Sequence, residues 1–113
     1  MAIYKVFRAD EWRSFEAAGE TAGAPVDLAD GYIHMSTAGQ LRGTLDKHFA
    51  DQDGLRLLAL DAGALGDRLR WEPSRGGQLF PHLYRALLWS EVAWDRPLER
   101  DADGRHALPD DLE

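Results

Sequence analysis

Two histidines and a glutamate are the side chains of this chain best suited to proton transfer on a bound molecule. They are His34, within Tyr-Ile-His-Met-Ser, and Glu72 and His82, which flank a Gly-Gly turn. Histidine and glutamate can exchange protons near neutral pH, so we expect these three residues to be catalytic. A metal triad is less favoured, because the three are scattered rather than paired on one element. A nucleophilic Ser36–His82 pair lacks a Gly-x-Ser-x-Gly turn.

The stretch from Trp71 to Tyr84 has the composition of half a ligand site. Its Gly-Gly pair permits positive φ and a close approach of the backbone to a ligand. Two prolines near its ends cannot donate to a strand ladder, so the hairpin is expected at a sheet edge. Trp71 on its own favours core packing over ligand contact. The residues of this stretch expected to contact a ligand are Trp71, Ser74, Arg75, Gly76, Gly77 and Tyr84.

Strand alternation predicts which side chains around His34 face the core. Ile33 and Met35 are expected to face the core, and Tyr32, His34 and Ser36 the other side. A lone histidine is more often a half-buried strand residue with a satisfied hydrogen bond. The Ser36–Thr37 pair, however, begins a predicted helix, where free N–H groups and the helix dipole favour an anion. We therefore predict that Tyr32, Ser36 and Thr37 help to bind a ligand beside His34.

The charge is acidic overall but locally basic. The 113 residues carry a net charge of −7, which argues against non-specific nucleic-acid binding. Between Arg68 and Arg85 four arginines accompany a single glutamate, a local net charge of +3 that suits a small carboxylate or phosphate ligand. The absence of cysteine excludes disulfides, thiolate metal sites and a cysteine nucleophile.

No signal-like segment and no apolar run approaching 18 residues is present. We therefore expect a cytoplasmic protein, without membrane attachment, that is a monomer or a weak dimer. No metal is expected.

The predicted architecture is α+β, with two helices against a mostly antiparallel sheet. Residues 1–97 are expected to form a single domain, and residues 98–113 a loose acidic tail. Residues 23–31 are expected to be a loop, and residues 86–94 the last strand region. Residues 55–61, apolar on both faces apart from Arg56, are predicted to be a central strand. The helices are expected at residues 9–20, ending at Gly19, and at residues 37–50, starting with a Thr37–Gln40 capping box.

Three blocks of the sequence resemble the bacterial family called domain of unknown function 952. They are Ile-Tyr-Lys-Val-Phe followed by Glu-Trp near the start, Pro25 to Thr37, and Leu69 to Tyr84. The resemblance implies a compact relative of the ADP-ribosyltransferase fold, a split β-sheet whose halves hold NAD between them. By that analogy His34, with Ser36 and Thr37, would hold a ribose or phosphate, and Tyr84 would form an aromatic wall.

The chain departs from the transferase pattern in its acidic residue. A late-strand glutamate usually assists transfer, but His82 stands near that place. Glu72 comes earlier than the pattern requires, and Glu91 belongs to no motif. We therefore expect binding of NAD, a related nucleotide or a phosphate ligand, with ADP-ribosyl or phosphoryl transfer or hydrolysis as the activity. The alternatives are a non-catalytic small-molecule sensor and a protein-interaction domain.

Overall fold

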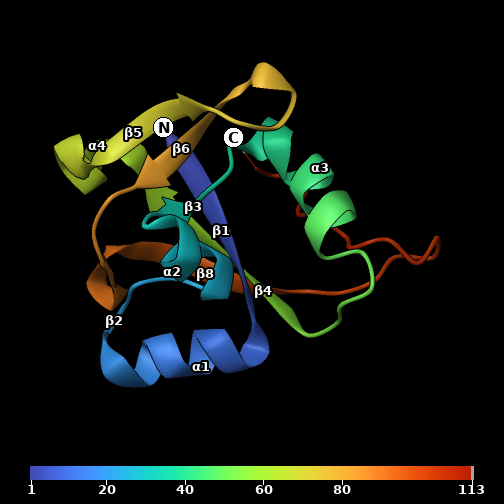
Figure 1. Cartoon of the computed structure of the whole chain (residues 1–113). Coiled ribbons are helices and arrows are strands. Elements are labelled where there is room, and N and C mark those ends of the chain that lie inside the picture. The colour runs from blue at the N-terminus through green and yellow to red at the C-terminus, as the bar shows by residue number, and fades with distance from the viewer. Residues whose placement is uncertain (113) are drawn as a thin grey trace.

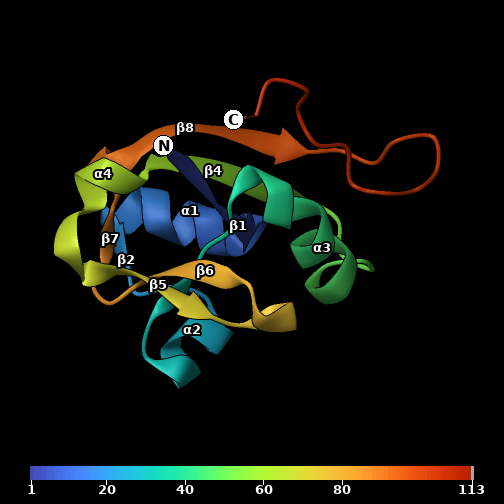
Figure 2. The same ribbon diagram turned by 90° about the horizontal axis from the view of Figure 1, so that it is seen from above.

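The computed structural model describes residues 1–112 and has an α+β architecture with mostly antiparallel sheets, which confirms the predicted class. Two three-stranded sheets, ordered β1-β4-β8 and β3-β6-β5, lie on different sides of the domain (Figures 1 and 2). A third, two-stranded sheet pairs β2 with β7. The strands are β1 (Ala2–Arg8), β2 (Glu20–Thr21), β3 (Ile33–His34), β4 (Leu55–Asp61), β5 (Leu69–Pro73), β6 (Leu79–Leu83), β7 (Leu87–Leu88) and β8 (Val92–Leu98).

Within residues 1–112 four α-helices accompany the sheets, so the expectation of two helices was wrong. The helices are α1 (Ala9–Ala18), α2 (Pro25–Asp30), α3 (Ala38–His48) and α4 (Ala62–Leu65). Gly19 ends α1 with a left-handed φ of 80°, as the sequence predicted. At the start of α3, Gln40 accepts a hydrogen bond of 3.0 Å from the Thr37 N–H, half of the predicted capping box. None of the described helices is long and apolar enough to span a membrane.

The central strand β4 is buried on both faces between β1 and β8, as its apolar sequence predicted. On one face, Ile3 and Phe7 of β1 pack with Leu58 and Leu60. On the other face, Tyr4 and Val6 pack with residues of α3 and β8. Because alternate side chains of β1 enter different clusters, this strand lies between the two hydrophobic clusters and contributes side chains to both.

The two three-stranded sheets meet at a single bridge and separate beyond it. The N–H of Tyr4 donates to the Ser36 carbonyl at 2.8 Å, and the N–H of Ser36 donates to the Tyr4 carbonyl at 2.9 Å. One residue further along β1, the side chain of Lys5 reaches across to the His34 carbonyl at 2.9 Å. The sheet is therefore split beside His34, and a side chain rather than a backbone ladder spans the gap.

Two expectations for local structure were wrong. Residues 23–31 contain the helix α2, because Pro25 occupies its first turn and Gly31 ends it with a φ of 85°. The predicted last strand region is divided into β7 and β8 by a 3₁₀ turn at Trp89–Glu91. The carboxylate of Glu91 stabilises this turn by accepting the Leu88 N–H at 3.0 Å.

The segment after Leu98 lies along the first sheet and α3. Arg100 donates to Asp53 at 2.7 Å and to the Gln52 carbonyl at 2.9 Å. His106 is buried, and its Nε2 lies 2.7 Å from the same carbonyl. The expectation that this segment is loose in solution stays a prediction, and these contacts are the ones that motion of the segment would have to break.

Candidate functional site

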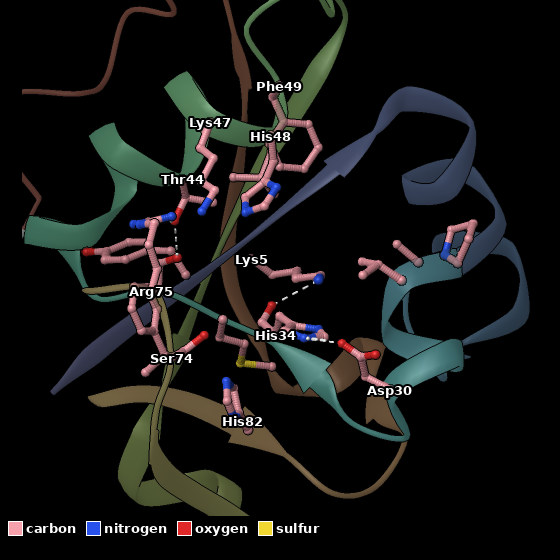
Figure 3. Close-up of a pocket in the computed structure, with 18 of the residues that line it drawn as sticks. Lys5, Asp30, His34, Thr44, Lys47, His48, Phe49, Ser74, Arg75 and His82 are labelled. Atoms are coloured by element: carbon pink, nitrogen blue, oxygen red, sulfur yellow. Dashed lines mark hydrogen bonds and ion pairs between the residues drawn. The ribbon is translucent and has the colours of Figure 1, made fainter. Parts of the chain in front are cut away.

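A cavity of about 590 Å³ opens where the sheets separate, between β1, β3, β6, α2 and α3 (Figure 3). Its volume is within the range of small-molecule sites. Its lining is rich in basic and titratable side chains, whereas the protein as a whole is acidic. The lysines, arginines and histidines that line it are Lys5, Arg8, His34, Lys47, His48, Arg75 and His82; the acidic residues are Glu11 and Asp30.

His34 lies at the cavity between two carboxylates. Its Nδ1 is 2.6 Å from Oδ1 of Asp27, and its Nε2 is 2.9 Å from Oδ2 of Asp30. Asp27 also accepts the His34 backbone N–H at 3.0 Å, so strand and ring are fixed together. Because a carboxylate only accepts hydrogen bonds, Nδ1 donates to the buried Asp27, and Nε2 faces a second acceptor, the more exposed Asp30.

Asp27 is fully buried and holds the site together. Its second oxygen accepts from Lys5 Nζ at 2.7 Å and from the Ala24 N–H at 2.8 Å. Burial alone would raise the pKa of Asp27, but the hydrogen bond from His34 and the charge of Lys5 outweigh it and lower the pKa to about 2. Burial lowers the pKa of Lys5, and the Asp27 charge opposes that change. The buried carboxylate is therefore ionised and paired.

His82 has a carboxylate partner of its own. This buried ring, which lies opposite His34 in the β3–β6 pairing, places Nδ1 2.9 Å from Oε1 of Glu72. The same oxygen accepts from the Tyr84 hydroxyl at 2.7 Å. Hydrogen bonds from Tyr84 and then His82 lower the pKa of Glu72. The Nδ1–H donates to Glu72, and the ring projects from β6 toward the cavity (Figure 3).

Tyr32 packs the two histidines into one aromatic cluster. Its ring stacks on His82 with centroids 4.2 Å apart, and it lies 4.6 Å from the His34 centroid and 5.1 Å from that of Tyr84. The two imidazole centroids are 5.4 Å apart. The structure thus brings His34 and His82 to one side of one cavity, each oriented by a carboxylate.

The opposite side of the cavity comes from α3 and the β5–β6 hairpin. Thr44, Lys47 and His48 project from α3, and Arg75 reaches toward them from the hairpin (Figure 3). The Arg75 Nη2 lies 3.4 Å from the Gln40 carbonyl and 3.5 Å from the Thr44 hydroxyl. Ser36 completes this side, 2.9 Å from Thr44 between their hydroxyl oxygens.

The predicted site residues fall into three groups. The cavity is lined by His34, Ser36, Ser74, Arg75 and His82. Tyr32, Glu72 and Tyr84 lie behind these and contact the histidines. The remaining four are placed elsewhere: Thr37 caps α3, Gly76 and Gly77 form the hairpin turn, and Trp71 is 38% exposed rather than packed in the core.

Several site residues were missed by the sequence reasoning. Asp27 and Asp30 were assigned to a loop, although Pro25 and Gly31 signal a short helix that carries both. Lys5 was not considered, although a lone lysine in an otherwise apolar strand signals a buried partner. Lys47 and His48 were not predicted as site residues, because the sequence did not indicate which face of α3 meets the hairpin. Within residues 1–112, no group of three or more acidic and histidine side chains is arranged to hold a metal ion.

Comparison with solved structures gives three matches, all to protein CC0527 from Caulobacter crescentus. Its crystal structure is 48% identical, covers 95% of this chain and 94% of that chain, and superposes with a TM-score of 0.90. A double mutant of it gives 47% identity over the same shares of the two chains and the same score. Its solution structure gives 50% identity, 92% and 90% coverage, and a TM-score of 0.83.

No curated protein matches the chain. The model of a family described as protein of unknown function (DUF952) matches residues 6–95, which include the end of β1, His34, His82 and the β5–β6 hairpin. The chain therefore belongs to the DUF952 family.

Proposed function

We propose that the protein binds a small nucleotide-type ligand carrying phosphate in the cavity between β1, β3 and α3. The observation that carries the proposal is the basic lining of this cavity in a chain whose net charge is −7. Of the lining cations, Arg8 is paired with Glu11 and Lys5 with Asp27, while Lys47 and Arg75 face the cavity without a carboxylate within 4 Å in residues 1–112. A phosphate or pyrophosphate would supply the missing charge.

The histidines support acid–base work on that ligand. Each ring donates its Nδ1–H to a carboxylate, which leaves Nε2 as the reactive nitrogen. Asp30, which is 46% exposed, covers Nε2 of His34 and can be displaced by a ligand without opening the core. In the hydrolysis of a phosphate ester, one imidazole would take a proton from water as the water oxygen bonds to phosphorus, and the other would protonate the leaving oxygen as the P–O bond breaks. In the cleavage of NAD, the nicotinamide would leave through its ring nitrogen, and only the imidazole that takes the proton from water would be needed. The reaction class is phosphoryl or ADP-ribosyl transfer or hydrolysis.

A relation to the ADP-ribosyltransferase fold belongs to this proposal. It is supported by the split sheet, in which Tyr4 of β1 and Ser36, two residues after β3, share one bridge and the strands then separate around the cavity. NAD is the corresponding candidate ligand.

A non-catalytic sensor is the second candidate, and the position of Glu72 favours it. The Glu72 carboxylate accepts a hydrogen bond from His82 but does not line the cavity. Among residues 1–112 the cavity lining therefore has no counterpart of the late acidic residue of a transferase. Incubation with labelled NAD or ADP-ribose at high protein concentration separates the two candidates. Released nicotinamide or phosphate supports the enzyme, and saturable binding without any product supports the sensor.

The ligand is tested by thermal shift with NAD, ADP-ribose, ATP and an RNA 2′-phosphate end. A ligand at 100 times its dissociation constant adds about 2.7 kcal/mol to folded-state stability, which raises the melting temperature of a domain of this size by roughly 10 °C. We expect a shift that is lost in His34→Ala and kept in Arg13→Gln, which removes an exposed charge on α1. If no nucleotide shifts the wild type, the nucleotide assignment fails.

A further inference from the structure

We propose that the α3 side of the cavity is a subsite for a phosphate or pyrophosphate group of the ligand, formed by Lys47, His48 and Arg75 with the Thr44 hydroxyl. This rests on the proposed function and adds the orientation of the ligand: its phosphate or pyrophosphate group lies at α3, and the bond to be processed lies near His34 and His82. A phosphate or pyrophosphate group carries negative charge on several acceptor oxygens, which suits several cations converging from two elements.

The pairing of the basic side chains favours this position. Seven of the arginines have a carboxylate oxygen within 4 Å, and so has Lys5: the arginines are Arg8, Arg42, Arg56, Arg85, Arg96, Arg100 and Arg105. In a chain with 20 acidic and 13 basic residues, carboxylates are in excess. In residues 1–112 the basic residues without such a partner are Arg13, Lys47, Arg68, Arg70 and Arg75, and of these Lys47 and Arg75 line the cavity.

The Arg75 guanidinium lies close over α3 because Gly43 of that helix has no side chain. Gly43 lies beneath it, and a Cβ added there would come within 2.9 Å of Arg75 Nη2. Glycine inside a helix destabilises the helix relative to alanine. Gly43 is therefore explained by the close approach of the arginine, whereas a Cβ at Gly39, in the same helix, would meet nothing within 4 Å.

The remaining contacts of Arg75 are weak. Its two hydrogen bonds are 3.4 and 3.5 Å long, near the limit for such contacts, and the guanidinium lies 5.0 Å from the Phe80 ring centroid. The guanidinium is thus positioned by packing, with most of its five N–H donors still available for an anion.

His48 shares the space with these two cations. Burial lowers the pKa of His48, and the charges of Arg75 and then Lys47 lower it further, as expected when positive groups crowd together. The C-terminal end of α3 favours Lys47 and His48 electrostatically. The end of α3 does not account for Arg75, which lies on the β5–β6 hairpin. The convergence of Lys47, His48 and Arg75 on the cavity therefore points to an anionic ligand.

The test uses inorganic phosphate and pyrophosphate as probes, titrated by calorimetry into the full chain. Arg75→Gln should weaken pyrophosphate binding at least about tenfold, since hydrogen bonds to charged groups are strong. Gly43→Ala should weaken binding several-fold by displacing the guanidinium, while its melting temperature stays at or above that of the wild type. Gly39→Ala is the matched control and should bind as the wild type does.

His34→Ala separates this inference from the proposed function. We expect it to bind pyrophosphate with wild-type affinity but to lose the preference for a full nucleotide. If phosphate affinity depends on Arg75 while no nucleotide binds, the proposed function fails and the subsite stands. The subsite is wrong if the wild type binds neither probe, or if Arg75→Gln and Gly43→Ala bind both probes as tightly as Gly39→Ala does.

Discussion

The two histidine–carboxylate pairs of the cavity are built in opposite ways. In the first pair, the side chain of Asp27 is fully buried and that of His34 is 30% exposed. In the second, the side chain of His82 is 3% exposed and that of Glu72 is 36% exposed. The buried carboxylate also neutralises Lys5, whereas the half-exposed one is supported by a tyrosine hydroxyl. We infer that the Asp27–His34 pair stabilises the split sheet as well as the site, and that the Glu72–His82 pair mainly orients the His82 ring.

The largest difference between the pairs is expected from neutralising each carboxylate. Asp27→Asn leaves the buried Lys5 without its counter-ion, and breaking a buried pair in this way costs about 3–5 kcal/mol of folding free energy. Glu72→Gln removes a charge that solvent reaches and retains a hydrogen-bonding oxygen for His82, so it should change the melting temperature little. Urea unfolding of both variants measures the contrast, and equal losses would contradict it.

A smaller difference is expected in acid. The pKa of Asp27 is lowered from 3.8 to about 2 in the folded state, so its stabilising effect is complete above about pH 4. That effect is lost as the pH falls toward 2, and it amounts to roughly 2 kcal/mol. Unfolding free energies measured between pH 5 and pH 2 should therefore fall more steeply for the wild type than for Asp27→Asn. Parallel pH profiles would show that the buried pair does not control acid stability.

The smallest effect concerns the tyrosine behind the second pair. The hydrogen bond from Tyr84 is the largest cause of the lowered pKa of Glu72, so Tyr84→Phe should raise that pKa toward 4.5 and leave the fold intact. A carbon-detected NMR titration of the Glu72 carboxylate measures this directly. An unchanged Glu72 pKa would mean that His82 alone determines the charge of its partner.

The sequence predicted those parts of the fold that local pattern controls. Alternation placed Ile33 and Met35 in the core and His34 at the cavity, and the apolar residues 55–61 identified the central strand. Both histidines and Arg75 were singled out because polar side chains beside strand ends and glycines are unusual in a plain core.

The rest depends on which elements meet in three dimensions. Lys5 and Asp27 are 22 residues apart, and Arg75 reaches a helix 31 residues earlier at Thr44. No periodicity encodes such pairings. The sequence did not determine the orientation of Trp71 either, because an aromatic residue on an edge strand can face the core or the solvent. In the structure Trp71 is exposed.

The measurement that tests the central claim most directly is NMR mapping of ADP-ribose on the full chain. We expect saturable shifts of the His34 and His82 ring signals together with those of Lys47 and Arg75, because all four line one cavity. Shifts confined to the small pocket beside Trp12 and Arg56, or no shifts at all, would contradict the claim that this basic cavity is a nucleotide site.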